Sequence, residues 1–186
     1  MLREIYLVGG IGPDIARMAC VKMDKLVAED PAADIFMFVD SFGGCIASML
    51  AITDKMQSLP CDIHTIVLGK AMSAGAFIAA HGTVGKRKAL PNAHFMFHEP
   101  NGMAVMTPDG MKVMDWCNDV TADLLAKRAG LAPSEYEDLI DRDFYIFADE
   151  LVNHKGSFLD EVIGFPSTEN ISSLPMCGGR SILFYV

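Results

Sequence analysis

One serine, Ser73, lies within an otherwise small or apolar stretch, GKAMSAGAFIAAHG, at residues 69–82. A serine hydroxyl becomes a nucleophile when a histidine accepts its proton and an acid orients that histidine. The helix predicted after Ser73 would set the hydroxyl beside backbone N–H groups without intrahelical acceptors, which suits an oxyanion. A serine at a helix start is more often a cap or a packing residue. The elbow motif GxSxG is also absent, since Ala71 stands two residues earlier.

Several side chains could serve as the base. The histidines are His64, His81, His94, His98 and His154. His98 closes the strand-like segment HFMFH before a Glu-Pro pair, at the kind of strand end where catalytic groups often lie. His94 alternates onto the same strand face, so spacing permits either one. Lys70, three residues before the serine, offers a Ser–Lys dyad instead. The aspartates are too numerous for composition to choose an acid.

Predicted strands and helices alternate along the chain, and they must position these residues. Periodicity predicts strands at residues 4–8, 34–40, 62–68, 88–90, 94–98 and 158–162. It predicts helices from Pro13, at 46–56, through the serine stretch, at 108–128, at 133–141 and at 148–155. This order predicts an α/β protein whose strands are buried on both faces.

Composition narrows the class of function. The chain has 186 residues, 51% hydrophobic content and a net charge of −9, which indicates a globular domain. Nucleic-acid binding needs clustered cations, so the acidic balance argues against it. We interpret the one short basic cluster, residues 86–88, as a solvated turn.

The five cysteines are scattered and odd in number, with no CxxC pair. This usage indicates reduced thiols in a cytoplasmic compartment, and no Cys/His spacing typical of a metal site occurs. The N-terminal apolar run is too short for a signal peptide. We expect the apolar run at 63–80 to be a buried core segment rather than a membrane span, because it contains Lys70 and several glycines.

Four blocks occur in an order that resembles one family. They are DIFMFVDSFGG, GKAMSAGAFIAAHGTVGKRKALPNAHFMFHEP, IDRDFYIFADE and GSFLDEVI. From residue 4 to residue 163 the chain resembles ClpP, the proteolytic subunit of the Clp protease, in the ClpP/crotonase superfamily of serine peptidases. The resemblance implies a repeated ββα superhelix with a protruding handle helix. It also implies a peptidase domain at residues 1–163 and a C-terminal extension at 164–186.

The resemblance assigns roles to individual residues. It implies that Ser73 is the nucleophile, His98 the general base and Asp143 the orienting acid. It implies that the backbone N–H groups of Gly44 and Ala74 donate to the oxyanion.

The same resemblance matches Asp141 and Arg142 to a contact between rings, although an ordinary surface ion pair explains the two residues as well. It implies neither metal nor cofactor. The implied substrate is a peptide or unfolded protein, cleaved inside a heptameric ring or two stacked rings. An AAA+ ATPase partner is implied as well.

The chain departs from the family pattern in several places. It starts almost at the first strand, without the usual axial hairpin. Phe42 replaces the usual proline before the glycines, and the segment between His98 and Asp143 is a few residues short. Ser58 and Lys88 replace residues of the ATPase-docking cleft, while Phe36 and Phe38 keep aromatic character there. These departures suit a divergent or phage-like relative.

Two other readings stay open at this stage. One is an ATPase-independent protease of the phage head-maturation type, or a catalytically weak assembly protein of the same fold. The other is acyl-CoA chemistry, as on the crotonase side of the superfamily, although no nucleotide-binding signature is evident. Oligomer size separates these readings, since a trimer or hexamer would favour the crotonase side.

Overall fold

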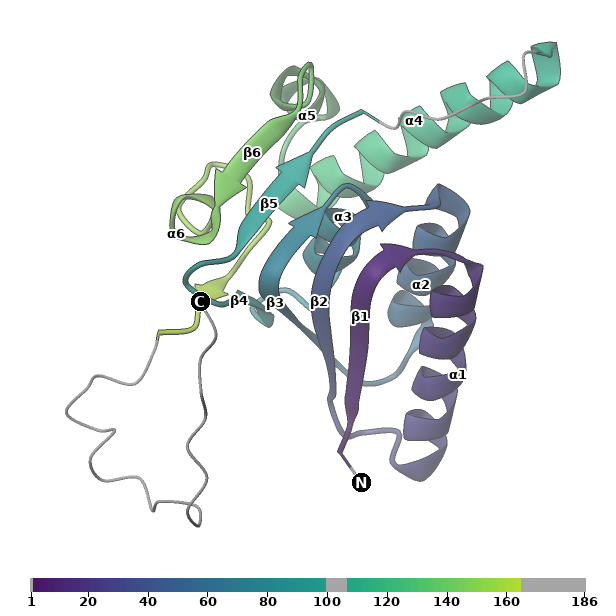
Figure 1. The fold of residues 1–186 in the computed structure, drawn as a ribbon, viewed down its shortest axis with the longest axis vertical. Helices are drawn as coiled ribbons and strands as arrows, with labels where there is room; N and C mark the ends of the chain where they lie inside the picture. The colour runs from purple at the N-terminus through teal and green to yellow at the C-terminus, as the bar shows by residue number, and fades with distance from the viewer. Residues whose placement is uncertain (1, 100–106, 165–186) are drawn as a thin grey trace.

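A computed structural model describes residues 2–99 and 107–164 (Figure 1). In chain order the elements are β1 (Glu4–Ile11), α1 (Pro13–Glu29), β2 (Ile35–Gly44), α2 (Ile46–Ser58), β3 (Ile63–Met72), α3 (Ala74–Ala80), β4 (Arg87–Ala89), β5 (His94–Phe97), α4 (Pro108–Ala129), α5 (Pro133–Leu139), β6 (Phe144–Phe147), α6 (Ala148–Leu151) and β7 (Glu161–Val162). Most of the predicted C-terminal extension lies outside the described residues.

A parallel sheet with strand order β1-β2-β3-β4-β7 forms the centre of the molecule. Its inward side chains, such as Leu7, Met37 and Val67, are buried and join one hydrophobic core. Helices α1 and α2 pack together along one side of the sheet (Figure 1). This layering follows from the alternation of strands and helices, because parallel strands need crossover connections that cover the sheet.

Strand β3 carries two different neighbours along its length. Its middle, Thr65 to Val67, pairs with β4, while Lys70 to Met72 pairs with β5. Strand β6 then runs antiparallel beside β5. Because β3 and β5 are parallel, the residues that follow them emerge at the same edge of the sheet. Ser73 and His98 are those residues.

Helix α4 projects from the body of the molecule, as expected for a handle (Figure 1). Thr107 caps it by accepting a hydrogen bond from the Gly110 N–H at 3.1 Å, and it ends at Gly130 with φ 70°. Its base buries Leu125 and Ala129 against the core, while Trp116 is exposed further out.

The interpretation of residues 86–88 as a solvated turn is wrong. Arg87 is 1% exposed, and its Nε and NH2 groups donate to both carboxylate oxygens of Asp160 at 2.8 and 2.6 Å. Lys86 bonds Asp34 at 2.7 Å and Asp62 at 2.6 Å. A buried guanidinium needs such a bidentate partner, and this one joins β4 to the segment before β7.

Several element boundaries differ from the sequence prediction. Strand β3 continues to Met72, so the serine stretch is strand first and helix afterwards. Helix α6 ends at Leu151 instead of residue 155, and the last strand is only Glu161–Val162. The extra β3 residues are held by β5, a tertiary pairing that local periodicity does not reveal.

The sheet face away from α1 and α2 presents aromatic side chains at its surface. Tyr6 stacks on Phe38 with ring centroids 4.8 Å apart, and Phe36 stacks on His64 at 4.4 Å. Tyr6, Phe36 and Val8 are exposed. Among the helices of residues 2–99 and 107–164, none is long and apolar enough to cross a membrane.

Candidate active site

Ser73 lies at the junction of β3 and α3 in an unusual backbone conformation. Its φ is 51° and its ψ is −122°, and it is the one non-glycine residue with positive φ in the described part of the chain. Such a conformation is strained for a residue with a side chain, and strained residues cluster at functional sites. The Ser73 side chain makes no capping hydrogen bond to α3, so the reading of this serine as an ordinary cap does not hold.

The backbone of Ser73 is held from two directions. Its N–H donates to the Met96 carbonyl in β5 at 2.8 Å, and its own carbonyl accepts from the Phe77 N–H in α3 at 3.0 Å. The first of these bonds joins the serine to β5, the strand that leads to His98, and the second joins it to α3.

Glycines make room for this tight junction. A Cβ on Gly43 would lie 2.7 Å from both the Met72 carbonyl oxygen and the Ser73 Cβ, and a Cβ on Gly75 would lie 3.0 Å from the Ser41 Cβ. The buried Ser41 hydroxyl donates to the Gly9 carbonyl at 2.6 Å and accepts from the Gly43 N–H at 3.0 Å. Sequence reasoning missed Ser41 and Gly43 as site residues, although the Gly-Gly pair at the end of β2 was a visible signal.

His98, the predicted general base, lies next to Ser73. Its Nε2 lies 2.8 Å from the Ser73 Oγ, across 25 residues of sequence. In the tautomer with its proton on Nδ1, the Nε2 accepts the serine O–H, which is the geometry of a general base. His94 lies at the other end of β5, where it pairs with Phe147. The spacing of the residues did not distinguish His94 from His98, but in the fold His98 contacts Ser73 and His94 lies at the opposite end of β5.

Asp143 lies beside this pair without bonding it. The β5–β6 ladder pairs Phe97 with Phe144, and the same register continued by one residue sets His98 opposite Asp143. The Asp143 side chain is exposed, and it makes no hydrogen bond or ion pair within residues 2–99 and 107–164. Catalytic hydrogen bonds are often long or poorly aligned before substrate binds, so Asp143 stays a predicted acid.

The two predicted oxyanion donors border the same cavity as Ser73. Gly44 and Ala74 both line it. Gly44 has φ 151°, and a Cβ there would lie 2.2 Å from the Ile11 carbonyl oxygen. The position therefore excludes a side chain and leaves the backbone accessible from the cavity. The Ala74 N–H belongs to the first turn of α3, where amides lack intrahelical acceptors.

Asp141 and Arg142 are both exposed on the loop before β6. Within the described residues they form no ion pair with each other or with a third group. The reading as an intramolecular surface ion pair therefore lacks support. A contact between subunits stays a prediction.

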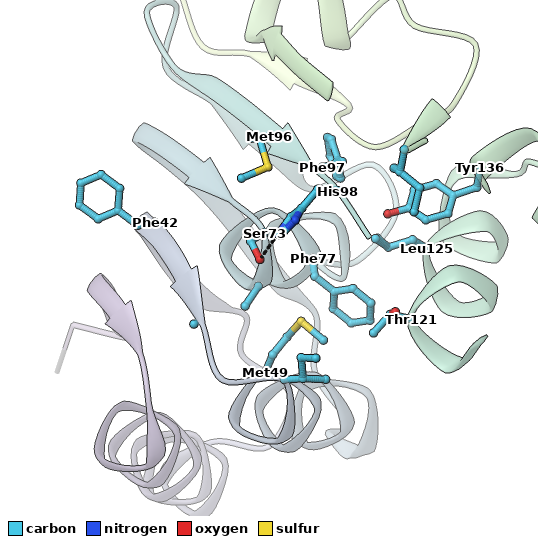
Figure 2. A pocket seen from close by; sticks show the side chains of 14 residues that line it. Phe42, Met49, Ser73, Phe77, Met96, Phe97, His98, Thr121, Leu125 and Tyr136 are labelled. Atoms are coloured by element: carbon cyan, nitrogen blue, oxygen red, sulfur yellow. Dashed lines mark hydrogen bonds between the residues drawn. The ribbon is translucent and has the colours of Figure 1, made fainter. Parts of the chain in front are cut away.

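The cavity beside the serine has a volume of about 320 Å³. Its deep end is apolar and is built from three helices, with Phe77 from α3, Leu125 from α4 and Tyr136 from α5 (Figure 2). Burial raises the pKa of the Tyr136 hydroxyl, so this group stays neutral. Sequence reasoning did not find the α4 and α5 residues, because their helical spacing equals that of ordinary core residues.

No group of three or more His, Cys, Asp or Glu side chains that could hold a metal occurs within the described residues. The titratable groups at the cavity are instead Ser73, His98 and Tyr136, alongside backbone amides. This set matches acyl transfer by a serine nucleophile.

A comparison with protein-family models matches residues 1–164 to the Clp protease family. The chain belongs to the Clp protease family. It has the mixed α/β fold of ClpP-type proteases, with a largely parallel sheet and the protruding helix α4. The family match supports a peptidase, and Clp proteases generally form oligomeric rings. The predicted domain boundary at residue 163 stays a prediction.

Proposed function

We propose that the chain is a serine endopeptidase in which Ser73 attacks the substrate carbonyl and His98 is the general base. The observation that carries this proposal is the 2.8 Å contact between the His98 Nε2 and the Oγ of a serine with strained backbone. Asp143 is the proposed orienting acid, because the strand register sets it opposite His98.

The reaction follows from these positions. The His98 Nε2 takes the Ser73 proton while Oγ forms a bond to the peptide carbonyl carbon. The carbonyl oxygen becomes an oxyanion, which the N–H groups of Gly44 and Ala74 stabilise. Protonated His98 then gives its proton to the leaving amine, and the C–N bond breaks. Water, deprotonated by His98, hydrolyses the acyl-enzyme and regenerates Ser73.

Asp143 contributes through His98. We propose that the Asp143 carboxylate accepts the Nδ1–H of His98 when substrate is bound. Such a bond fixes the ring tautomer and stabilises the imidazolium that forms during the attack.

The deep apolar end of the cavity indicates the substrate class. Phe77, Leu125 and Tyr136 are all buried there, and an apolar side chain next to the cleaved bond would displace water from them. We propose peptides and unfolded protein segments with such a side chain as substrates.

Lys70 does not fit the role of base. Its Nζ lies 3.2 Å from the Asp40 Oδ1 and 4.1 Å from the centroid of the Phe42 ring. No hydrogen bond joins this ammonium to the Ser73 Oγ within the described residues. The Ser73–His98 contact therefore favours the triad over a Ser–Lys dyad.

Labelling with a fluorophosphonate tests this function. Wild-type protein should be labelled at Ser73 and should cleave an unfolded substrate, because both reactions need an activated serine. Ser73→Ala and His98→Ala should lose both reactions, while Lys70→Met should keep labelling. Cleavage that persists in Ser73→Ala, or a Lys70→Met variant as inactive as Ser73→Ala, would overturn the triad.

We further propose that the peptidase works within a heptameric ring or two stacked rings in the cytoplasm. The exposed Trp116 on the handle helix is a surface that neighbouring subunits would cover, and the exposed aromatic sheet face stays open in this assembly. The same aromatic face is where an ATPase partner would dock. Size-exclusion chromatography with light scattering should give seven or fourteen subunits, whereas a trimer or hexamer would contradict this assembly.

Within the described residues Asp143 makes no hydrogen bond or ion pair, and this favours an alternative function, a catalytically weak assembly protein of the same fold. An ATPase-independent protease of the head-maturation type is a further alternative. In the assembly role the ring forms but neither labelling nor cleavage occurs. In the ATPase-independent role the purified ring cleaves folded viral or host proteins without ATP.

A further inference from the structure

An exposed aromatic ring borders the cavity on the side away from its deep end. Phe42 lies near the end of β2, lines the cavity and is 65% exposed. In Figure 2 it lies on the opposite side of Ser73 from Phe77 and Tyr136. A peptide whose carbonyl sits at Ser73 and whose neighbouring side chain fills the deep end therefore continues toward Phe42.

A bulge in β3 brings a cation to this ring. Val39 pairs with Val67 and Ser41 pairs with Ala71, so residues 68–70 of β3 face Asp40 alone. Bulges re-aim side chains and often lie next to active sites. Here the bulge directs Lys70 toward the end of β2 that carries Asp40 and Phe42.

Charge and packing at the bulge hold the ring from one face. The Lys70 Nζ lies 4.1 Å from the Phe42 ring centroid, within the range of a cation–π contact, and 3.2 Å from the Asp40 Oδ1. The Asp40 carboxylate offsets the ammonium charge. The Lys70 ammonium thus occupies one face of the Phe42 ring, and the rest of this exposed side chain is available to a ligand.

We propose that Phe42 is a specificity-determining residue that binds an aromatic substrate side chain on the far side of the scissile bond. Lys70 is a positioning residue, which acts by holding the Phe42 ring. The preferred substrate then has an apolar side chain in the deep end of the cavity and an aromatic side chain across the cleaved bond, against Phe42. This inference rests on the proposed peptidase function.

Matched peptides test the preference. Cleavage sites in a peptide mixture are mapped by mass spectrometry, and kcat/KM is then measured for two peptides that differ only by Phe or Ala at the position facing Phe42. The wild type should prefer Phe, since an aromatic pair adds a factor of about 3 to 10. Phe42→Ala should remove this preference, and Phe42→Leu should keep a part of it. Phe147→Ala is the control, because Phe147 is similarly exposed on β6 but does not line the cavity.

Variants of Lys70 distinguish its proposed role in positioning the Phe42 ring from a general loss of folded protein. Lys70→Met should lower the Phe/Ala ratio by about 2- to 3-fold, and Lys70→Arg should restore it, because the cation over the ring returns. A ratio within a single enzyme variant does not change when the fraction of folded protein changes.

The outcomes distinguish this inference from the proposed function. If the wild type cleaves and is labelled, but Phe42→Ala keeps the full Phe/Ala ratio, the Phe42 role is overturned and the peptidase function stands. If the wild type shows neither labelling nor cleavage, both are overturned. A ratio that Phe147→Ala lowers as much as Phe42→Ala also overturns the role of Phe42.

Discussion

The two ends of helix α3 carry polar groups in opposite circumstances. At the N-terminal end, the Ser73 hydroxyl contacts His98 and borders a cavity. At the C-terminal end, His81 is 2% exposed, and its Nδ1 lies 2.7 Å from the Phe77 carbonyl oxygen. The His81 Nε2 is buried, with no hydrogen-bond partner within the described residues. One end of this short helix presents a hydroxyl to a cavity, and the other end holds a histidine ring that is almost wholly buried.

The difference shows that access, rather than residue type, separates a catalytic histidine from a structural one. The ring of His81 stacks on Phe77 with centroids 4.2 Å apart, and its carbonyl accepts from Arg128 at 2.8 Å. Burial lowers the pKa of His81 to about 4, so the ring is neutral at pH 7. Because its side chain is almost wholly buried, we expect His81 to affect stability, whereas His98 is the proposed catalytic histidine.

Exchanging each histidine for alanine gives the largest expected contrast. His98→Ala should lower kcat/KM by about 10⁴-fold or more, since members of a triad act as a unit. Its melting temperature should stay close to that of the wild type, because His98 is only half-buried. His81→Ala should lower the melting temperature while the folded fraction keeps its kcat/KM. Comparable activity losses in the two variants would contradict the comparison.

A substitution at Gly43 tests how far the structure at the Ser73 end of α3 depends on close packing. Gly43→Ala should cost about 3 kcal/mol of unfolding free energy, because φ is +96° and the new Cβ would lie 2.7 Å from a backbone oxygen. Gly85→Ala is the matched control, with φ +84° and no atom within 4 Å of the new Cβ. Its cost should be about 1 kcal/mol. Denaturant unfolding measures both, and equal costs would show that packing against Ser73 is not tight.

The pH dependence of the unfolding free energy tests the structural role of His81. Its folded pKa, about 4, lies below the unfolded value of 6.5, so the unfolded chain binds more protons between these values. Stability should therefore fall as the pH drops below about 6.5, by about 2 kcal/mol from this group at pH 5. Urea unfolding of wild type and His81→Gln at pH 7 and pH 5 measures the effect. The variant should lose less stability between the two pH values, and an identical loss would show that His81 is not the group responsible.

Local patterns predicted most of the strands and helices and made Ser73 a weak candidate for a nucleophile, but they could not bring distant residues together. Apolar runs predicted the strands that precede and follow α1 and α2 in the sequence. Pro108 and Gly130 correctly marked the two ends of α4. The choice of His98 over His94 depended on family resemblance, and its physical cause is the pairing of β3 with β5. No local signal carries such a pairing.

Other parts of the site were beyond sequence reasoning for the same physical reason. The burial of Arg87 depends on Asp160, which is 73 residues away. Leu125 and Tyr136 line the cavity only because α4 packs against α3 and α5 packs against α4. The role of Asp143 stays a prediction, since a strand register indicates proximity but not a bond.

The hydrogen bond from the Ser73 N–H to the Met96 carbonyl has a consequence for control of the enzyme. It ties the proposed nucleophile to the strand that presents the base two residues later, so a displacement of β5 carries both groups in the same direction. Their separation then stays nearly constant while the body of the molecule flexes. Asp143 lies just before β6, which pairs with β5. A displacement of β6 relative to β5 would therefore change the distance between the proposed acid and the proposed base, while the contact between Ser73 and His98 is kept.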